Sequence, residues 1–230
     1  MTREDIFKTV DHTLLAQTAT WEEIKEICDD AIKYQTASVC IPASYVKRAK
    51  DYVDGKMAIC TVIGFPNGYS TTAVKEYETK DAILNGADEI DMVINVAALK
   101  DGEEETVYQD ILAVRRACEK QTLKVIIETC LLTDDEKRTA CRLAEKAGAD
   151  FVKTSTGRAG ASALSHIRIM REALPAHVGI KFSGFGTLNA PELALWAFFL
   201  GADVLGSPCG DVVVDVLSSG YAEVGMLAGS

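Results

Sequence analysis

The stretch NGADEIDMVI, residues 85–94, joins a predicted helix to a predicted strand. Glycine commonly follows the last residue of a helix, because it adopts the left-handed backbone conformation without steric cost. Apolar strand residues follow Gly86 almost at once, which marks the end of a helix and the start of a strand. The same pattern returns in AGADFV at 147–152 and in LGADVL at 200–205. Junctions of one kind at three places indicate a chain built from repeated α/β units.

Short apolar segments alternate with longer amphipathic segments along the chain. Helical patterns occupy residues 71–87 and 134–149, and strands that alternate with helices favour parallel pairing. We therefore predict that residues 1–230 form a single (β/α)8 barrel domain of the α/β class with a short N-terminal helix. An open doubly wound sheet is the alternative, but no glycine-rich dinucleotide loop follows the first strand. The predicted strands are at 8–12, 37–41, 58–63, 89–94, 123–128, 150–154, 178–182 and 202–206.

Composition limits the kinds of partner. The 230 residues carry a formal net charge of −10, and 48% of them are hydrophobic, which fits one large globular domain. Such an acidic chain lacks the basic surface that sequence-independent nucleic-acid binding needs, and an anionic membrane surface would repel it. We expect a small-molecule partner, with no nucleic acid and no membrane. An anionic substrate would need local cations and backbone N–H groups to bind against the overall field.

The cysteines and the apolar segments indicate in which cellular compartment the protein is expected. Seven cysteines without the CxxC spacing of metal sites indicate free thiols in a reducing cytoplasm. No apolar run approaches the roughly 18 residues that span a membrane. The charged segment MTREDIFKTV at 1–10 does not have the pattern of a signal peptide. We therefore expect a cytoplasmic protein.

Polar residues collect at the predicted carboxyl ends of the strands, where barrels of this kind place their active sites. Lys153 and Lys181 belong to consecutive strands, so they should be neighbours. A second cation and partial burial both lower the pKa of a lysine, because both disfavour the charged form. A neutral amine attacks a carbonyl carbon to form a Schiff base. Asp91 should point into the same space as a general base, acting directly or through water.

Each of these residues also has an interpretation without catalysis. A lysine at a strand end commonly extends its ammonium group to solvent, and Asp91 would then form a structural ion pair with Lys181. His12 is more often a buried or capping histidine than a catalyst. Cys40 is most simply a buried apolar side chain. Two lysines on adjacent strands, together with an aspartate, favour the catalytic interpretation.

Six segments together resemble the 2-deoxyribose-5-phosphate aldolase family, in the order in which that family has them. The resemblance implies a class I aldolase on a (β/α)8 barrel, a lyase of carbohydrate degradation and deoxyribonucleotide catabolism that needs no cofactor and no metal. Such enzymes cleave 2-deoxyribose 5-phosphate to acetaldehyde and glyceraldehyde 3-phosphate, and they catalyse the reverse addition. The segments are DHTLL (11–15), VCIPASYV (39–46), EIDMVINVAALKDG (89–102), LKVIIET (123–129), GADFVKTSTG (148–157) and VGIKFSG (178–184).

The resemblance also implies roles for individual residues. Lys153 matches the lysine that forms the Schiff base. Lys181 matches the second lysine, which lowers the pKa of the first, and Asp91 matches the aspartate of the proton relay. Other positions match groups that support the site or contact the substrate: Asp11, Cys40, Thr154 and Thr156.

The sequence departs from the family where the family binds phosphate. The second lysine is usually followed by two glycines, a basic residue and a threonine, whereas here Phe185 stands at the second glycine and no basic residue follows. In GSPCGD at 206–211, Pro208 removes one N–H donor from a turn that would bind phosphate. Cys209 replaces a hydroxyl, and Asp211 adds a negative charge. The candidates for contacting this end of the substrate are Gly157, Arg158, Gly184, Phe185, Gly186 and Ser207.

Three hypotheses follow. In the first, phosphate still binds, held by Arg158 and by backbone groups. In the second, the same imine chemistry acts on a non-phosphorylated 2-deoxy sugar or aldehyde, with Phe185 covering its tail. In the third, the barrel has lost catalysis and binds a metabolite or a protein, although the retention of Lys153, Lys181 and Asp91 argues against it. Barrels of this family are often dimers, so a homodimer is expected, but the sequence shows no interface signature.

Overall fold

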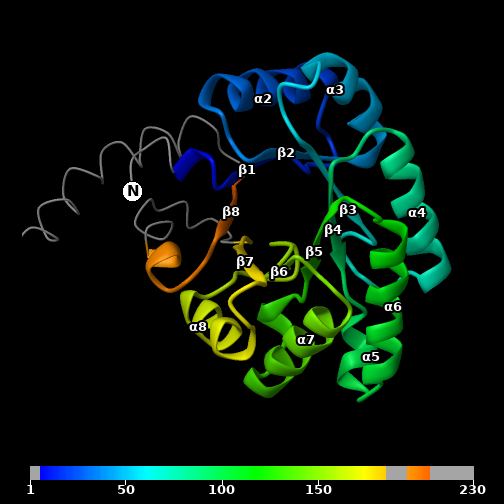
Figure 1. The fold of residues 1–230 in the computed structure, drawn as a ribbon, viewed down its shortest axis with the longest axis vertical. Helices are drawn as coiled ribbons and strands as arrows, with labels where there is room; N and C mark the ends of the chain where they lie inside the picture. Colours follow the sequence, from blue (N-terminus) through cyan, green and yellow to red (C-terminus); the bar gives the residue numbers. More distant parts are fainter. Residues whose placement is uncertain (1–5, 185–195, 208–230) are drawn as a thin grey trace, which may run out of the picture.

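The computed structural model describes residues 6–184 and 196–207. Eight parallel strands close into a barrel in chain order, and helices surround it (Figure 1). Closure excludes the open sheet and confirms the predicted (β/α)8 fold, with strand boundaries within two residues of those expected from the sequence. The strands are β1 (Val10–Thr13), β2 (Ser38–Ile41), β3 (Ile59–Ile63), β4 (Glu89–Val93), β5 (Thr122–Ile126), β6 (Phe151–Lys153), β7 (Gly179–Phe182) and β8 (Val204–Ser207).

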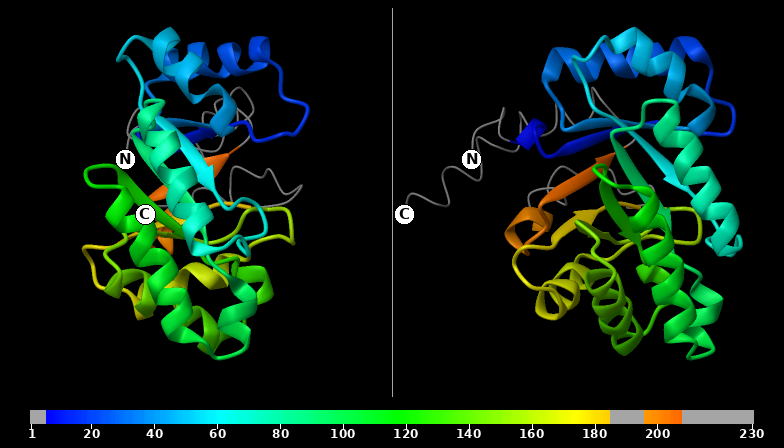
Figure 2. Two further views of the ribbon diagram at one scale, coloured as in Figure 1. Left: turned by 90° about the vertical axis from the view of Figure 1, so that its right-hand side faces the viewer. Right: turned by 45° about the vertical axis from the view of Figure 1, so that its right-hand side comes forward.

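The helices cover the outside of the barrel, and α4 and α6 run side by side on one flank (Figure 2). Within the described ranges, no helix is long and apolar enough to cross a lipid bilayer. Of the predicted N-terminal helix the structure describes only residues 6–7, which are helical. The helices are α2 (Trp21–Tyr34), α3 (Val46–Val53), α4 (Thr72–Leu84), α5 (Val96–Lys100), α6 (Glu104–Ala117), α7 (Asp134–Lys146) and α8 (Leu164–Ala173), with 3-10 turns η1 (Ala43–Tyr45) and η2 (Thr129–Leu131).

The three glycine junctions have the predicted backbone conformation. Gly86, Gly148 and Gly201 have φ angles of 104°, 86° and 104°, in the left-handed region that a side chain would disfavour. Each glycine ends a helical segment and is followed within three residues by β4, β6 or β8. These glycines therefore set the points at which the chain turns from the outer layer back into the barrel.

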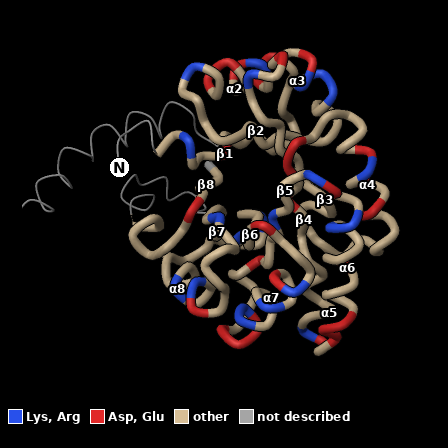
Figure 3. The backbone as a smooth tube through the Cα atoms, viewed as in Figure 1, with Lys and Arg blue, Asp and Glu red and all other residues tan. Residues whose placement is uncertain are grey.

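Strand residues alternate between two environments, as the two-residue period of a strand requires. One set is apolar and packs under the helices; Ile90, Val125 and Val152 are fully buried in this core. The alternate positions carry charge, as at Asp91 and Lys124. Figure 3 shows basic and acidic positions on the ring of strands as well as on the outer helices. Barrel interiors are usually filled by branched apolar side chains, so a charged interior points to function.

A buried ion pair joins the outer helices to β4. Lys75 of α4 is fully buried and donates to the Asp110 carboxylate of α6 at 2.5 Å and to the backbone oxygen of Val93 at 2.8 Å. Val93 is the last residue of β4, two positions after Asp91. The pair therefore supports the strand that carries the central aspartate.

We expect the Asp110→Asn variant to lose about 3 kcal/mol of unfolding free energy, because it leaves the buried Lys75 ammonium without a charged partner. Urea denaturation measures this loss. The control is Glu76→Gln, which removes an exposed pair with Lys80 on the same helix and should cost less than about 1 kcal/mol. Equal losses in the two variants would contradict this account of the buried pair.

Candidate active site

The centre of the barrel holds a buried carboxylate shared by two lysines. Asp91 of β4 is fully buried. Its Oδ2 accepts hydrogen bonds from Lys153 Nζ at 2.7 Å and from Lys181 Nζ at 2.8 Å. Lys153 and Lys181 are register partners on the neighbouring strands β6 and β7. The structure thus brings together the three residues that the sequence selected as a catalytic group.

Asp11 of β1 extends this cluster. Its Oδ2 accepts from Lys181 Nζ and, at 2.8 Å, from Lys124 Nζ, while Ser38 Oγ donates to its Oδ1 at 2.8 Å. Asp11 is 1% exposed, so the charge of its carboxylate is neutralised by protein groups. The predicted supporting position of Asp11 is thus next to the second lysine.

Lys124 and Glu89 belong to the same network, although the sequence analysis assigned them no role. Lys124 Nζ lies 3.5 Å from Asp91 Oδ1 and donates to the Glu89 carboxylate. Glu89 is the first residue of β4, and its side chain is 18% exposed. Three lysines and three carboxylates therefore form one continuous set of contacts inside the barrel.

The lysines fix the charge state of the carboxylates. Burial alone would raise the pKa of Asp91, but Lys153 and Lys181 outweigh it and hold that pKa well below its usual range. Burial likewise raises the pKa of Asp11, and Lys124 and Lys181 outweigh it to give a pKa of about 2. Burial lowers the pKa of Lys181, but Asp11 and Asp91 outweigh it and raise that pKa well above its ordinary value. Lys181 therefore carries a positive charge, and its expected effect on Lys153 stays a prediction.

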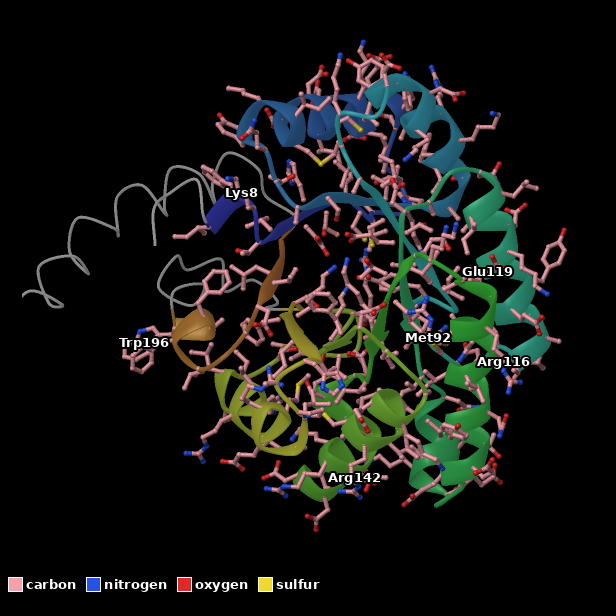
Figure 4. All side chains as sticks on the ribbon, viewed as in Figure 1. Lys8, Met92, Arg116, Glu119, Arg142 and Trp196 are labelled. Atoms are coloured by element: carbon pink, nitrogen blue, oxygen red, sulfur yellow. The ribbon has the colours of Figure 1, made fainter. Side chains whose placement is uncertain are left out.

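A pocket of about 280 Å³ opens above this network. The loops after β1, β6 and β7 line it together with Phe65 and with Gly206 of β8. Of the three lysines of the network, Lys153 is among the described residues that line the pocket. Lys181 and Lys124 are not in this lining, and they are 0% and 2% exposed. Figure 4 shows that Arg142, on an outer helix, instead points away from the barrel.

Four of the predicted substrate contacts line this pocket: Thr156, Gly157, Arg158 and Gly184. A Cβ on Gly184 would lie 2.9 Å from the backbone nitrogen of Gly157, so the close approach of the two loops requires glycine there. The Arg158 guanidinium donates to the backbone oxygen of Leu15 at 2.8 Å. Arg158 therefore links the loop after β6 to the loop after β1 at the edge of the pocket.

Glu128, just after β5, fixes the loop that carries Thr156. Its carboxylate accepts from the Thr156 backbone N–H at 3.1 Å and from Thr156 Oγ1 at 2.6 Å. Glu128 is buried and has a φ angle of 55°, which is uncommon for a residue with a side chain and concentrates at functional sites. Apart from the position of an acidic residue at a strand end, no sequence signal indicates this role.

Thr154 and Cys40 do not line the pocket. Thr154 Oγ1 donates to the backbone oxygen of Ser183 at 2.8 Å and accepts from its N–H at 3.0 Å, so it ties the end of β6 to the chain after β7. The structure thus shows a structural contact for Thr154, whose side chain alternates with that of Lys153 along the strand, and its expected substrate contact stays a prediction. Cys40 is fully buried beside its register partner Cys60, whose hydrogen bond lowers the pKa of the Cys40 thiol although burial raises it.

The remaining predicted positions lie at or beyond the limits of the described chain. Phe185, Gly186 and the segment 208–211 fall outside the described residues. Ser207 is the last residue of β8 and the register partner of His12 on β1. Its backbone is therefore at the carboxyl end of the barrel, where the sequence analysis expected it.

Among the described residues, two groups of side chains have the composition of metal ligands. Cys40, Cys60 and Asp91 form one group, and Asp11, Cys60 and Glu89 form the other, with ligand atoms within 4.8 Å of one another. The carboxylates of both groups already accept hydrogen bonds from lysine ammonium groups. A metal ion would have to displace those cations, so the donor set favours amine chemistry over metal coordination.

Comparisons with known proteins agree with this geometry. A family model described as DeoC/LacD family aldolase matches residues 6–190. The deoxyribose-phosphate aldolase of Streptococcus pyogenes serotype M28 is 54% identical over 205 residues, which cover 89% of this chain and 91% of that protein. The deoxyribose-phosphate aldolase of Streptococcus agalactiae serotype Ia has the same identity and coverage.

Solved structures of aldolases have the same fold. The aldolase QR15 superposes with a TM-score of 0.88 at 30% identity, covering 95% of this chain and 98% of its own. The deoxyribose phosphate aldolase of Aeropyrum pernix superposes with a TM-score of 0.88 at 26% identity, covering 95% and 93% of the two chains. The family expected from the sequence segments is confirmed: the chain belongs to the DeoC/LacD family of aldolases.

Proposed function

We propose that this chain cleaves 2-deoxyribose 5-phosphate to acetaldehyde and glyceraldehyde 3-phosphate, and catalyses the reverse aldol addition, through an imine on Lys153. One observation carries the proposal: a single lysine of a buried ion network reaches the pocket. The streptococcal relatives, named deoxyribose-phosphate aldolases, support the choice of substrate.

The contacts of the three lysines support Lys153 as the nucleophile. Lys181 contacts two carboxylates, Asp11 and Asp91, and Lys124 contacts those two and Glu89. For Lys153 the described residues provide one carboxylate partner. It is therefore the lysine that needs the least rearrangement to turn its nitrogen toward a carbonyl carbon in the pocket.

The first half of the proposed reaction makes the imine. The Lys153 amine attacks C1 of the open-chain sugar, and the resulting carbinolamine loses water to give a protonated imine on Nζ. The proton that the carbinolamine oxygen needs in order to leave as water comes from the neighbouring hydrogen-bonded groups. Asp91 accepts from both Lys153 and Lys181, so it connects the reacting nitrogen to a second proton donor.

The second half breaks the carbon–carbon bond. A base takes the proton of the C3 hydroxyl, through water and the Asp91–Lys181 pair. The C3 oxygen forms the carbonyl of the new aldehyde as the C2–C3 bond breaks. The electron pair of the C2–C3 bond moves into the imine and leaves an enamine on Lys153. Glyceraldehyde 3-phosphate departs. Protonation of the enamine carbon and addition of water then release acetaldehyde and return the amine.

The phosphate end of the substrate is proposed to lie beside Arg158 and the glycine pair of Gly157 and Gly184. These residues line the pocket with Lys153, and a guanidinium matches a phosphate through paired hydrogen bonds. The alternative is the same chemistry on a non-phosphorylated 2-deoxy sugar or aldehyde. It is supported by Phe185 and Pro208, which replace groups that the family uses for phosphate, and by the bond that already links Arg158 to Leu15.

We expect borohydride, added with acetaldehyde, to attach a reduced ethyl group to Lys153, and the Lys153→Met variant to show neither this adduct nor detectable cleavage activity. Peptide mass spectrometry locates the adduct. Lys47→Met, which removes an exposed lysine of α3, should leave both activity and labelling unchanged. Full cleavage activity in Lys153→Met would exclude Lys153 as the nucleophile.

We expect Arg158→Gln to raise the KM for 2-deoxyribose 5-phosphate about tenfold or more, because a charged hydrogen bond to the substrate is lost, and to leave kinetics with free 2-deoxyribose unchanged. Acetaldehyde release measures both reactions. Arg142→Gln, on the outer surface (Figure 4), serves as the control. Equal turnover of the two sugars by the unaltered protein would favour the non-phosphorylated substrate.

We also propose that residues 1–230 form one cytoplasmic domain that assembles as a homodimer. The six cysteines of the described chain are free thiols, as a reducing compartment requires. Val74, Tyr77 and Leu84 are exposed on one face of α4, and Tyr69 lies just before that helix; such gathered apolar side chains mark interaction surfaces. The similar protein from Aeropyrum pernix is described as a tetramer.

Light scattering should therefore give twice the chain mass of 24.8 kDa, because the apolar face of α4 would be covered by a second copy. Leu84→Lys should shift the mass toward that of one chain. Lys80→Glu, which changes a charge on the same helix, should not. A single-chain mass for the unaltered protein would contradict the dimer.

A further inference from the structure

The charged network continues from the pocket toward the opposite end of the barrel. Lys153 lines the pocket at the carboxyl end of β6, and Glu89 is the first residue of β4, at the amino end. Between them the contacts pass through Asp91, Lys181, Asp11 and Lys124 in turn. The proposed chemistry uses the first part of this chain and leaves Lys124 and Glu89 without a function.

We infer that Glu89 and Lys124 are positioning residues whose opposite charges set how readily Lys153 releases its proton. Neither Glu89 nor Lys124 is among the described residues that line the pocket. Lys124 reaches Asp91 at 3.5 Å, and Asp91 holds Lys153 at 2.7 Å, so one carboxylate separates the two lysines. Glu89 acts through Lys124, to which it is directly bonded. The catalytic meaning of this inference rests on the proposed function.

The physical reason is a balance of charge among groups that are mostly buried. With every lysine protonated, the network holds three cations and three anions. Imine formation needs a neutral Lys153 amine, which leaves the network with one excess negative charge. Interactions between charges in a protein interior are stronger than in water. A change of one charge at Glu89 or Lys124 should therefore alter the ease of that proton release.

The two charges act in opposite directions. Without the Glu89 charge, the network has an excess of positive charge, so Lys153 should lose its proton at lower pH. Without the Lys124 charge, Asp91 and Asp11 hold their remaining cations more strongly, so Lys153 should lose its proton at higher pH. A double variant restores the balance. A residue that only held the fold together would not produce shifts of opposite sign.

Apart from the substituted side chains, the groups around Lys153 are the same in every variant. Burial lowers the pKa of Lys124, but the surrounding acidic groups, Asp11 foremost, outweigh it and raise that pKa well above its ordinary value, so Lys124 is a cation wherever it is present. Burial raises the pKa of Glu89, and Lys124 opposes this shift. Within the described part of the chain, the remaining titratable or charged groups that face the interior from neighbouring strands or line the pocket edge are Asp11, Cys40, Cys60, Asp91, Lys181 and Arg158.

The test is an NMR titration of the protein with ¹³C-labelled lysine side chains, in which the Lys153 signal is assigned by its absence in Lys153→Met. We expect the Lys153 midpoint to fall by on the order of one pH unit in Glu89→Gln and to rise by a similar amount in Lys124→Met. The variant with both changes should return toward the original midpoint. The pH at which acetaldehyde is trapped on Lys153 by borohydride should move in the same directions.

Asp88→Asn is the matched control. Asp88 precedes Glu89, and its carboxylate pairs with Lys50 of α3 outside the barrel interior, so its loss should not move the midpoint. Unchanged midpoints, or midpoints that move in the same direction in Glu89→Gln and Lys124→Met, would overturn the inference. If Lys124→Met does not fold, the comparison of Glu89→Gln with Asp88→Asn decides, and equal midpoints overturn it.

The titration also separates this inference from the proposed function. If acetaldehyde is never trapped on the unaltered protein, the proposed imine chemistry fails, while the Lys153 midpoints still report on Glu89 and Lys124. If acetaldehyde is trapped and the midpoints do not respond, the function stands and the inference fails.

Discussion

The Asp91 carboxylate is the interaction on which the rest of the interior depends. It is fully buried and accepts hydrogen bonds from Lys153 and Lys181, and Lys124 lies close to its second oxygen. Removing one partner of a buried ion pair leaves an uncompensated charge, which costs far more than the loss of a surface pair. Without Asp91, Lys153 would lose the carboxylate partner that the described residues give it, and Lys181 and Lys124 would each lose one of theirs. This carboxylate makes a charged barrel interior possible at all.

A charged interior requires stability from elsewhere, and the outer layer provides it. The outward sides of the strands carry Ile90, Val125, Val152 and Ile180, all buried under the helices. Apolar burial of this kind is the main favourable contribution to folding. Side chains alternate between the two faces of each strand. One face packs against the helices and stabilises the fold, and the other face carries the charged side chains of the interior.

The fold and the central residues could both be predicted from the sequence, because both depend on local sequence signals. Left-handed glycines after helices and the alternation of strands with helices are local signals, and parallel register then makes Lys153 and Lys181 neighbours. Glu89 and Lys124 were missed because their contacts depend on the closure and stagger of the barrel, which brings Lys124 of β5 to Asp11 of β1. Sequence spacing does not show that contact. The side-chain direction of Thr154, by contrast, follows from strand alternation.

The two ends of the pocket are built from separate parts of the chain. Lys153 is held from within the barrel by strand residues, whereas Arg158 stands on a loop that Glu128 anchors through Thr156. Changes in the loops therefore leave the buried ion network intact. Under the proposed function, this separation allows the sequence to keep Lys153, Lys181 and Asp91 while it differs from the aldolase pattern at Phe185 and Pro208. The strands then set the carbonyl chemistry and the loops set what the far end of the pocket accepts, so the two can change independently.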